Sequence, residues 1–112
     1  MELTELVKII DGALLLSPPA GRPVTCGFTC DMLSLVMARG ARGMAWVTVQ
    51  THLNVIAVAS LHEMACVILP DNIRMESAVL EKAREEGIAV VSSALSAYAI
   101  CGRLAGEGLP SV

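Results

Sequence analysis

From residue 30 onward the chain alternates between helix-like and strand-like segments, and this alternation constrains the fold more than any other feature. Helices are expected near 30–39, 52–63, 74–86 and 94–106, and strands near 44–49, 65–69 and 88–92. Such alternation is typical of βαβ units, in which right-handed crossovers join parallel strands through helices. Residues 66–69 and 88–91 are continuous apolar runs, as expected in a sheet covered on both faces. The sequence therefore predicts a three-layer α/β/α sandwich with a mostly parallel sheet of about five strands.

Residues 1–29 add a short helix and two further strand candidates. Four apolar residues recur at helical spacing before the stop signal Asp11-Gly12: Leu3, Leu6, Val7 and Ile10. The apolar run 13–17 ends at a Pro-Pro pair, and residues 23–28 form a second extended candidate. We expect these two segments to pair with each other or to flank the main sheet. Because a chain of 112 residues suits one hydrophobic core, residues 1–112 are expected to form a single domain.

Composition and charge limit the compartment and the classes of partner. Hydrophobic residues make up 54% of the chain, yet no apolar run approaches the roughly 18 residues of a membrane span. The start of the chain, MELTELVKIIDG, lacks the basic residues of a secretory signal, so we expect a cytoplasmic protein without membrane contact. The net charge of −3 and the pI near 5.2 argue against nucleic acid as a partner.

The four cysteines should be reduced thiols in the cytoplasm, where redox buffers oppose disulfides: Cys26, Cys30, Cys66 and Cys101. Cys66 and Cys101 lie in apolar patterns and are expected in the core, where cysteine behaves as a small hydrophobic residue. The spacing of Cys26 and Cys30 differs from the usual Cys-x2-Cys, and no second ligand pair lies nearby. We therefore expect no metal and no cofactor.

Two of the predicted helices are apolar on almost every side, which bears on assembly. Helix 52–63 has apolar residues on both faces: Leu53, Ile56, Ala57 and Leu61 on one, and Val55, Val58 and Ala59 on the other. Helix 30–39 leaves only three residues for solvent: Asp31, Ser34 and Arg39. Because so small a domain has difficulty burying both helices, we expect them to form the interface of a twofold homodimer. The alternative is that another element of the same chain, such as the N-terminal helix, covers helix 52–63.

The common nucleotide and hydrolase motifs GxxxxGK(S/T), GxGxxG, HExxH and GxSxG are absent. Two polar segments remain, and each lies where a predicted strand gives way to a helix, the usual ligand position in open α/β sheets. The first runs from Thr25 to Asp31. Gly27 permits backbone conformations that other residues avoid, and Thr29 or Asp31 is expected to cap the helix or leave its amides free for an anion.

The second polar segment follows the central predicted strand and includes Gln50, Thr51, His52 and Asn54. Their donors and acceptors suit a planar or carbonyl-bearing ligand, and pockets commonly form at this end of a strand. A purely structural interpretation stands beside this one. In it, Thr51 is the helix cap, and His52 or Asn54 makes hydrogen bonds across the dimer. His62, later on the same helix, is expected at the surface.

Residues 21–28, GRPVTCGF, resemble the stretch for which the DRTGG domain family is named. Arg22, Thr25 and Gly27 occupy their places in that motif, whereas Gly21 and Cys26 replace its Asp and its first Gly. The resemblance covers nearly the whole chain and includes two further segments: 46–61 and 88–93. More distantly, the chain is similar to the N-terminal domain of HPr kinase/phosphorylase.

The resemblance implies a regulatory or dimerising module, because DRTGG domains occur beside CBS domains in regulated pyrophosphatases and beside acyltransferase or CbiA-type domains. It implies no kinase activity, since the phosphate-binding loop of the kinase is missing. We therefore expect a non-enzymatic homodimer that binds a small anionic or nucleotide-like ligand, or a partner protein. The expected ligand-binding residues are Arg22, Thr25, Cys26, Gly27, Thr29, Gln50, Thr51, His52 and Asn54. The alternatives are a small enzyme that uses Cys26 or Cys30 with His52, and a metal-binding redox accessory protein.

Overall fold

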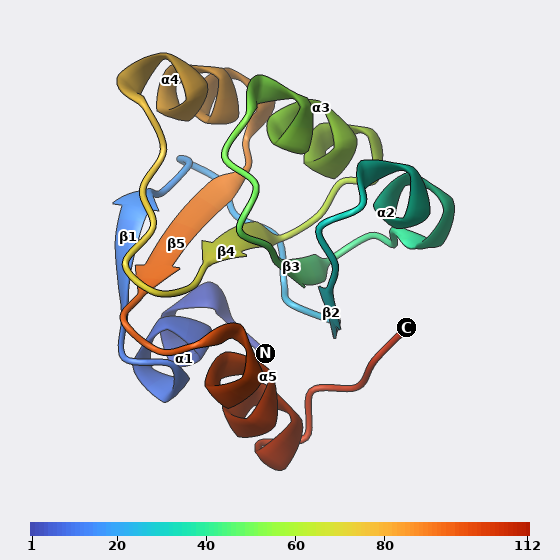
Figure 1. The fold of residues 1–112 in the computed structure, drawn as a ribbon, viewed down its shortest axis with the longest axis vertical. Helices are drawn as coiled ribbons and strands as arrows, with labels where there is room; N and C mark the ends of the chain where they lie inside the picture. Colours follow the sequence, from blue (N-terminus) through green and yellow to red (C-terminus); the bar gives the residue numbers. More distant parts are fainter.

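The computed structural model describes residues 1–112 and has three layers, with five strands between two layers of helices (Figure 1). In chain order the elements are α1 (Leu3–Ile9), β1 (Gly12–Leu16), β2 (Cys26–Thr29), α2 (Leu33–Arg39), β3 (Met44–Val47), α3 (Leu53–Leu61), β4 (Cys66–Leu69), α4 (Ser77–Glu86), β5 (Ala89–Ser93) and α5 (Ala97–Gly106). Helices α2, α3 and α4 cover one face of the sheet, and α1 and α5 cover the other (Figure 1). The predicted α/β/α sandwich is confirmed. None of the helices has the length and hydropathy that crossing a membrane requires.

The strands lie side by side in the order β1-β5-β4-β3-β2. Strands β2 to β5 are parallel, and β1 runs antiparallel to β5. The two N-terminal strand candidates therefore flank the sheet on opposite sides and do not pair with each other. Because the four parallel strands point the same way, their last residues meet at one edge, called here the carboxyl edge. The loops that precede these strands meet at the opposite edge, called the amino edge.

Each face of the sheet has its own hydrophobic core, and strand β3 contributes to both. Its side chains alternate, so Met44 and Trp46 pack toward α2, α3 and α4, whereas Ala45 and Val47 pack toward α1 and α5. All residues of β3 and β4 are buried, as expected for strands covered on both faces. The Trp46 indole N–H donates to the carbonyl of Cys30 at 2.8 Å, which joins β3 to the end of β2.

Three helices begin later than the apolar periodicity predicted. Helices α2, α4 and α5 begin at Leu33, Ser77 and Ala97, whereas the predicted starts were 30, 74 and 94. The difference has a physical cause, because apolar residues of the preceding loops also pack against the core. Met75 is 7% exposed although it precedes α4, and Leu95 packs against the other core before α5 begins. Loop residues of this kind extend an apolar pattern beyond the helix itself.

Helix α3 lies between α2 and α4, which cover its sides within the same chain (Figure 1). The buried residues of α3 are Val55, Ile56, Val58 and Ala59. Its outer face stays open, with Leu53 44% and Leu61 66% exposed. Burial of this outer face in a homodimer therefore stays a prediction. The covering elements are the neighbouring helices and not α1, which lies on the opposite face of the sheet (Figure 1).

Candidate functional site

Two of the residues predicted to bind a ligand lie at the amino edge and are held by internal hydrogen bonds. The Arg22 guanidinium donates to the carbonyls of Met64 at 3.4 Å and Gly87 at 3.2 Å. The Thr25 hydroxyl donates to the carbonyl of Arg42 at 2.8 Å. These carbonyls belong to the loops before β4, β5 and β3. Both side chains thus tie the incoming loops of the sheet together.

Strand β2 holds the next three predicted residues. Cys26 is a core residue with 7% exposure, which keeps its thiol from contact with a substrate. The Gly27 amide donates to the carbonyl of Pro110 at 2.8 Å, so the C-terminal segment runs beside this edge strand. The Thr29 hydroxyl donates to the carbonyl of Val47 at 3.2 Å and does not cap α2. None of these three residues lines the hollow that Gln50, Thr51 and His52 line.

Asp31 joins the ends of β2 and β3, a role that the sequence did not predict. Its Oδ1 accepts hydrogen bonds from the Thr48 hydroxyl at 2.8 Å and from the Val49 amide at 3.0 Å. The Gln50 side-chain amide donates to the Asp31 carbonyl at 3.2 Å. Helix α2 is capped at Met32, without a side-chain hydrogen bond, so the expectation of an Asp31 cap is wrong. Asp31 instead fixes the loop that carries the second polar segment.

His52 is the N-cap of α3, whereas the structural interpretation of the sequence placed the cap at Thr51. Its Nδ1 accepts a hydrogen bond from the Asn54 amide at 3.1 Å. The neutral ring therefore carries its proton on Nε2, which is free to donate. His62 is half-buried, not fully exposed, and its Nε2 lies 2.8 Å from the Met37 carbonyl at the end of α2.

The loops after β3 and β4 enclose a polar hollow of about 600 Å³ at the carboxyl edge. Its lining residues are Val49, Gln50, Thr51, His52, Leu53, Arg74, Glu76, Ala78 and Val79. Three of the predicted residues therefore meet here, whereas Asn54 lies outside the lining. Arg74 and Glu76 were not predicted from the sequence. Their position was a usable signal, because the loop after β4 opens at the same edge as the loop after β3.

The hollow combines donors and acceptors in one place. Arg74 is exposed and takes part in none of the ion pairs of the chain. Glu76 is the N-cap of α4 and makes no side-chain cap, so the first amides of this helix have no side-chain partner. Glu76, Ala78 and Val79 at the start of α4 line the hollow. Gln50 keeps its amide oxygen as an acceptor, since its nitrogen is used by Asp31. The arrangement suits a ligand with an anionic group and hydroxyl or amino donors.

Of the remaining cysteines, Cys66 and Cys101 have raised thiol pKa values, and Cys30 contacts a backbone carbonyl. Cys66 is fully buried in β4, and burial raises the pKa of its thiol to about 12. Partial burial also raises the pKa of Cys101. The Cys30 sulfur lies 3.7 Å from the Met32 carbonyl. No group of three or more His, Cys, Asp or Glu side chains comes together as a metal-binding cluster.

The sequence matches no known protein-family profile and no curated protein. The fold is similar to a crystal structure of the CBS and DRTGG domains of the regulatory region of Clostridium perfringens pyrophosphatase, complexed with the activator diadenosine tetraphosphate. The TM-score is 0.74 at 12% identity, and the match covers 97% of this chain. This chain spans 47% of the length of that one, about half. At this identity the likeness is one of fold: the chain has a DRTGG-like α/β fold.

Proposed function

We propose that the chain is a regulatory module that acts as a homodimer and binds a small anionic, nucleotide-like ligand at the carboxyl edge. The observation that carries the proposal is the meeting of Arg74 with Gln50, Thr51 and His52 around one hollow. Two separate loops supply these groups, and the sheet brings the loops together. The nucleotide activator in the similar regulatory structure supports a ligand of this class.

The chemistry of the hollow fits the parts of a nucleotide. A phosphate would accept hydrogen bonds from Arg74, from Nε2 of His52 and from the first amides of α4. The Gln50 oxygen and the Glu76 carboxylate would accept from ribose hydroxyls or from a base amino group. Glu76 disfavours a bare anion, because a carboxylate beside the site repels it. We therefore expect a nucleotide to bind more tightly than inorganic phosphate.

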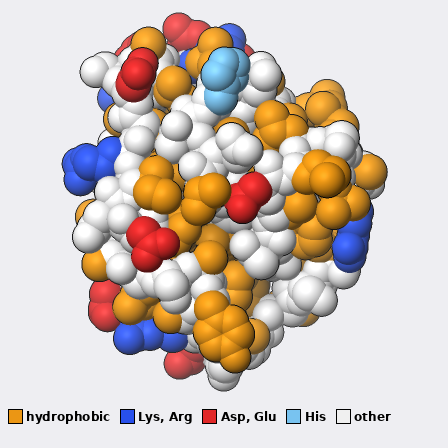
Figure 2. All heavy atoms as spheres, viewed as in Figure 1, with side chains coloured by type: hydrophobic (Ala, Val, Ile, Leu, Met, Phe, Trp, Pro, Cys, Tyr) orange, Lys and Arg blue, Asp and Glu red, His pale blue; other side chains and the backbone are white.

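The homodimer would form through the outer faces of α2 and α3. Leu53, Ala57 and Leu61 are spaced four residues apart and form an exposed stripe without charge. Three residues of or beside α2 are also exposed: Met32 at 63%, Leu35 at 40% and Met37 at 42%. Figure 2 shows hydrophobic side chains gathered over α2. A second copy could cover this surface in a twofold arrangement without burying unpaired charges.

Isothermal titration of ATP, diadenosine tetraphosphate and acetyl phosphate tests the ligand. We expect saturable binding of a nucleotide to the wild type and a loss of about 10-fold or more in affinity for Arg74→Gln, because a charge-assisted pair is removed. Arg84→Gln is the matched control, since Arg84 lies on α4, outside the lining of the hollow, in an ion pair with Glu81. Equal effects of both variants, or no heat with any compound, would overturn the ligand proposal. In the second case a partner protein would be the remaining candidate.

Sedimentation equilibrium at micromolar concentration tests the assembly. We expect a dimer for the wild type and a monomer for Leu61→Lys, because a charge on the stripe would be buried without a partner. Tyr98→Lys is the control, since Tyr98 is 91% exposed on α5, on the other face of the sheet. A monomeric wild type would overturn the homodimer without affecting the ligand proposal.

A further inference from the structure

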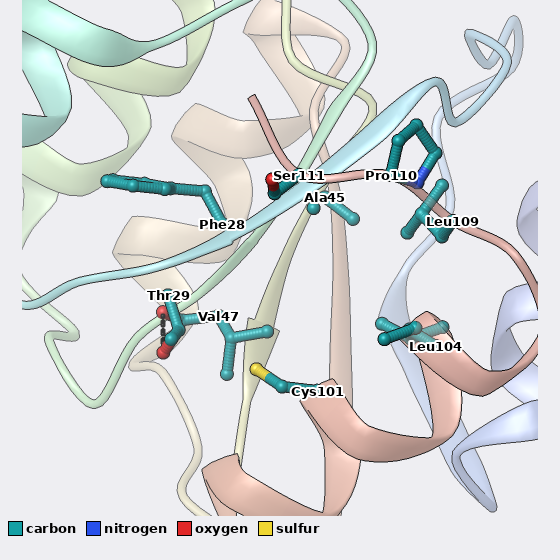
Figure 3. A pocket seen from close by; sticks show the side chains of 11 residues that line it. Phe28, Thr29, Ala45, Val47, Cys101, Leu104, Leu109, Pro110 and Ser111 are labelled. Carbon is teal, nitrogen blue, oxygen red and sulfur yellow. Dashed lines mark hydrogen bonds between the residues drawn. The ribbon is translucent and has the colours of Figure 1, made fainter.

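A second hollow, of about 330 Å³, lies on the α1 and α5 face of the sheet (Figure 3). It is lined by Gly27, Phe28, Thr29, Ala45, Val47, Cys101, Leu104, Ala105, Leu109, Pro110 and Ser111. None of these residues carries a formal charge at neutral pH. Helices α1 and α5 are the only ones on this face, and the hollow occupies the space beyond α5, over β2 and β3.

The C-terminal segment closes this space from the side. Its Pro110 carbonyl accepts from the Gly27 amide at 2.8 Å, and Ser111 forms a parallel bridge with Gly27. A Cβ atom at residue 27 would lie 3.3 Å from the side chain of Leu109, so a glycine allows the close approach. The walls thus come from three parts of the chain that are far apart in sequence, as is common for binding pockets.

We propose that this hollow binds a neutral small molecule that has an apolar body and one polar end. The volume of the hollow falls at the lower end of the range for small-molecule pockets, roughly 300–1,000 Å³. The absence of any cation in the lining disfavours nucleotides and other anions, because their charge would be buried unpaired. The site and its ligand class therefore differ from those of the polar hollow at the carboxyl edge.

The polar end of the ligand would lie beside Thr29 and Cys101. Figure 3 shows these two side chains with Val47 on one side of the open space, and Leu104, Leu109 and Pro110 on the other. The Thr29 hydroxyl donates to the Val47 carbonyl, so its oxygen lone pairs remain available to accept. The Cys101 thiol is neutral, because partial burial raises its pKa. The apolar body would replace water against Leu104 and Leu109, which is the favourable part of binding.

The neutral dye N-phenyl-1-naphthylamine provides a direct test, because its fluorescence rises in apolar surroundings. We expect saturable binding to the wild type and a loss of about 10-fold or more in affinity for Ala105→Phe, which places a ring in the hollow. Ala94→Phe is the matched control, since Ala94 is exposed and lies outside the lining. Excess ATP should leave the dye in place.

Thiol modification supplies a second readout that does not depend on the variants. Cys101 lines the hollow, whereas Cys30 is half-buried and lies outside it. The dye should slow the reaction of Cys101 with N-ethylmaleimide and leave the reaction of Cys30 unchanged, as followed by peptide mass spectrometry. Absence of dye binding, displacement by ATP, equal affinity of Ala105→Phe and wild type, or equal protection of both cysteines would each overturn the proposal.

Discussion

The amino and carboxyl edges of the sheet carry similar polar residues, but at the amino edge their donors are bonded within the protein and at the carboxyl edge they line a hollow. At the amino edge, the Arg22 guanidinium donates hydrogen bonds to two backbone carbonyls, and the Thr25 hydroxyl donates to a third. At the carboxyl edge, Arg74 has no ion-pair partner and lines an open hollow with His52. Residue type alone therefore does not mark a site. A site also requires donors that the protein has not already used.

At the amino edge, hydrogen bonds and an ion pair join the loops to one another. The Gly43 amide donates to the Glu63 carbonyl at 3.0 Å, and the Arg42 side chain pairs with that of Glu63. The Ser60 hydroxyl donates to the Glu86 carboxylate at 2.9 Å, which joins α3 to α4. The carboxyl edge differs because the helices begin there, and their first amides lack partners within the helix. One edge of the sheet thus stabilises the fold, and the other carries the hollow at which we propose that a ligand binds.

The largest expected effect on stability comes from Gly43→Ala at the amino edge. Gly43 has φ +76°, and an added Cβ would lie 2.5 Å from the Thr25 hydroxyl oxygen and 2.9 Å from the Pro23 carbonyl oxygen. We expect a loss of about 2–4 kcal/mol in the free energy of unfolding, from the left-handed backbone and the steric clash together. Urea unfolding measures it. Gly21→Ala is the control, because nothing lies within 4 Å of the added atom. Equal stability of both variants would show that the amino edge is not tightly packed.

Replacing Arg22 or Arg74 with methionine should have opposite effects at the two edges. Arg22→Met should lower the free energy of unfolding by about 1–3 kcal/mol, because two carbonyls lose a charged donor. Arg74→Met should change it by less than about 0.5 kcal/mol, as is usual for an exposed side chain. In titrations with ATP the order should reverse, with affinity lost only in Arg74→Met. A destabilised Arg74→Met, or an Arg22→Met that unfolds like the wild type, would break the distinction between the edges.

Asp31 tests how far the carboxyl edge is preorganised. Asp31→Ala leaves the Thr48 hydroxyl and the Val49 amide without their acceptor, which should cost about 1–2 kcal/mol of stability. The same change frees the loop that carries Gln50, so the affinity for ATP should fall as well. Asp31→Asn keeps an acceptor oxygen and should lie between the alanine variant and the wild type. Calorimetry and urea unfolding on the same samples check both effects, and unchanged ATP affinity in Asp31→Ala would contradict the positioning role.

The smallest effect is a pH dependence at the amino edge. Hydrogen bonds from Lys82 and then Ser60, together with the charge of Lys82, lower the pKa of Glu86. Because this pKa is lower in the folded than in the unfolded chain, the stabilisation is present above the unfolded value, about 4.3, and is lost as the pH falls. Thermal unfolding between pH 3 and 7 should therefore show a slightly steeper acid decline for the wild type than for Glu86→Gln. Glu81→Gln serves as the control, and identical profiles for all three proteins would contradict the prediction.

The sequence predicted the layers and the parallel sheet because continuous apolar strands and alternating helices are strong local signals. It did not predict where the edge strands lie, since β1 and β2 are both short apolar runs beside proline and glycine. Its structural interpretation placed the cap of α3 at Thr51 rather than His52, because the residue that caps a helix depends on the geometry of the preceding loop. Arg22 was expected to bind a ligand, and the carbonyls that accept its hydrogen bonds come from residues far away in sequence. Long-range contacts of this kind leave no local pattern.

The most direct test of the account is a titration of the isotopically labelled protein with ATP, followed by amide chemical shifts in two-dimensional NMR. We expect the largest shift changes in residues 50–53 and 74–79, at the carboxyl edge, and none at Arg22, Thr25 or Arg42. Changes centred on the amino edge, or confined to the β2 segment 27–29, would contradict the assignment of the polar hollow as the ligand site.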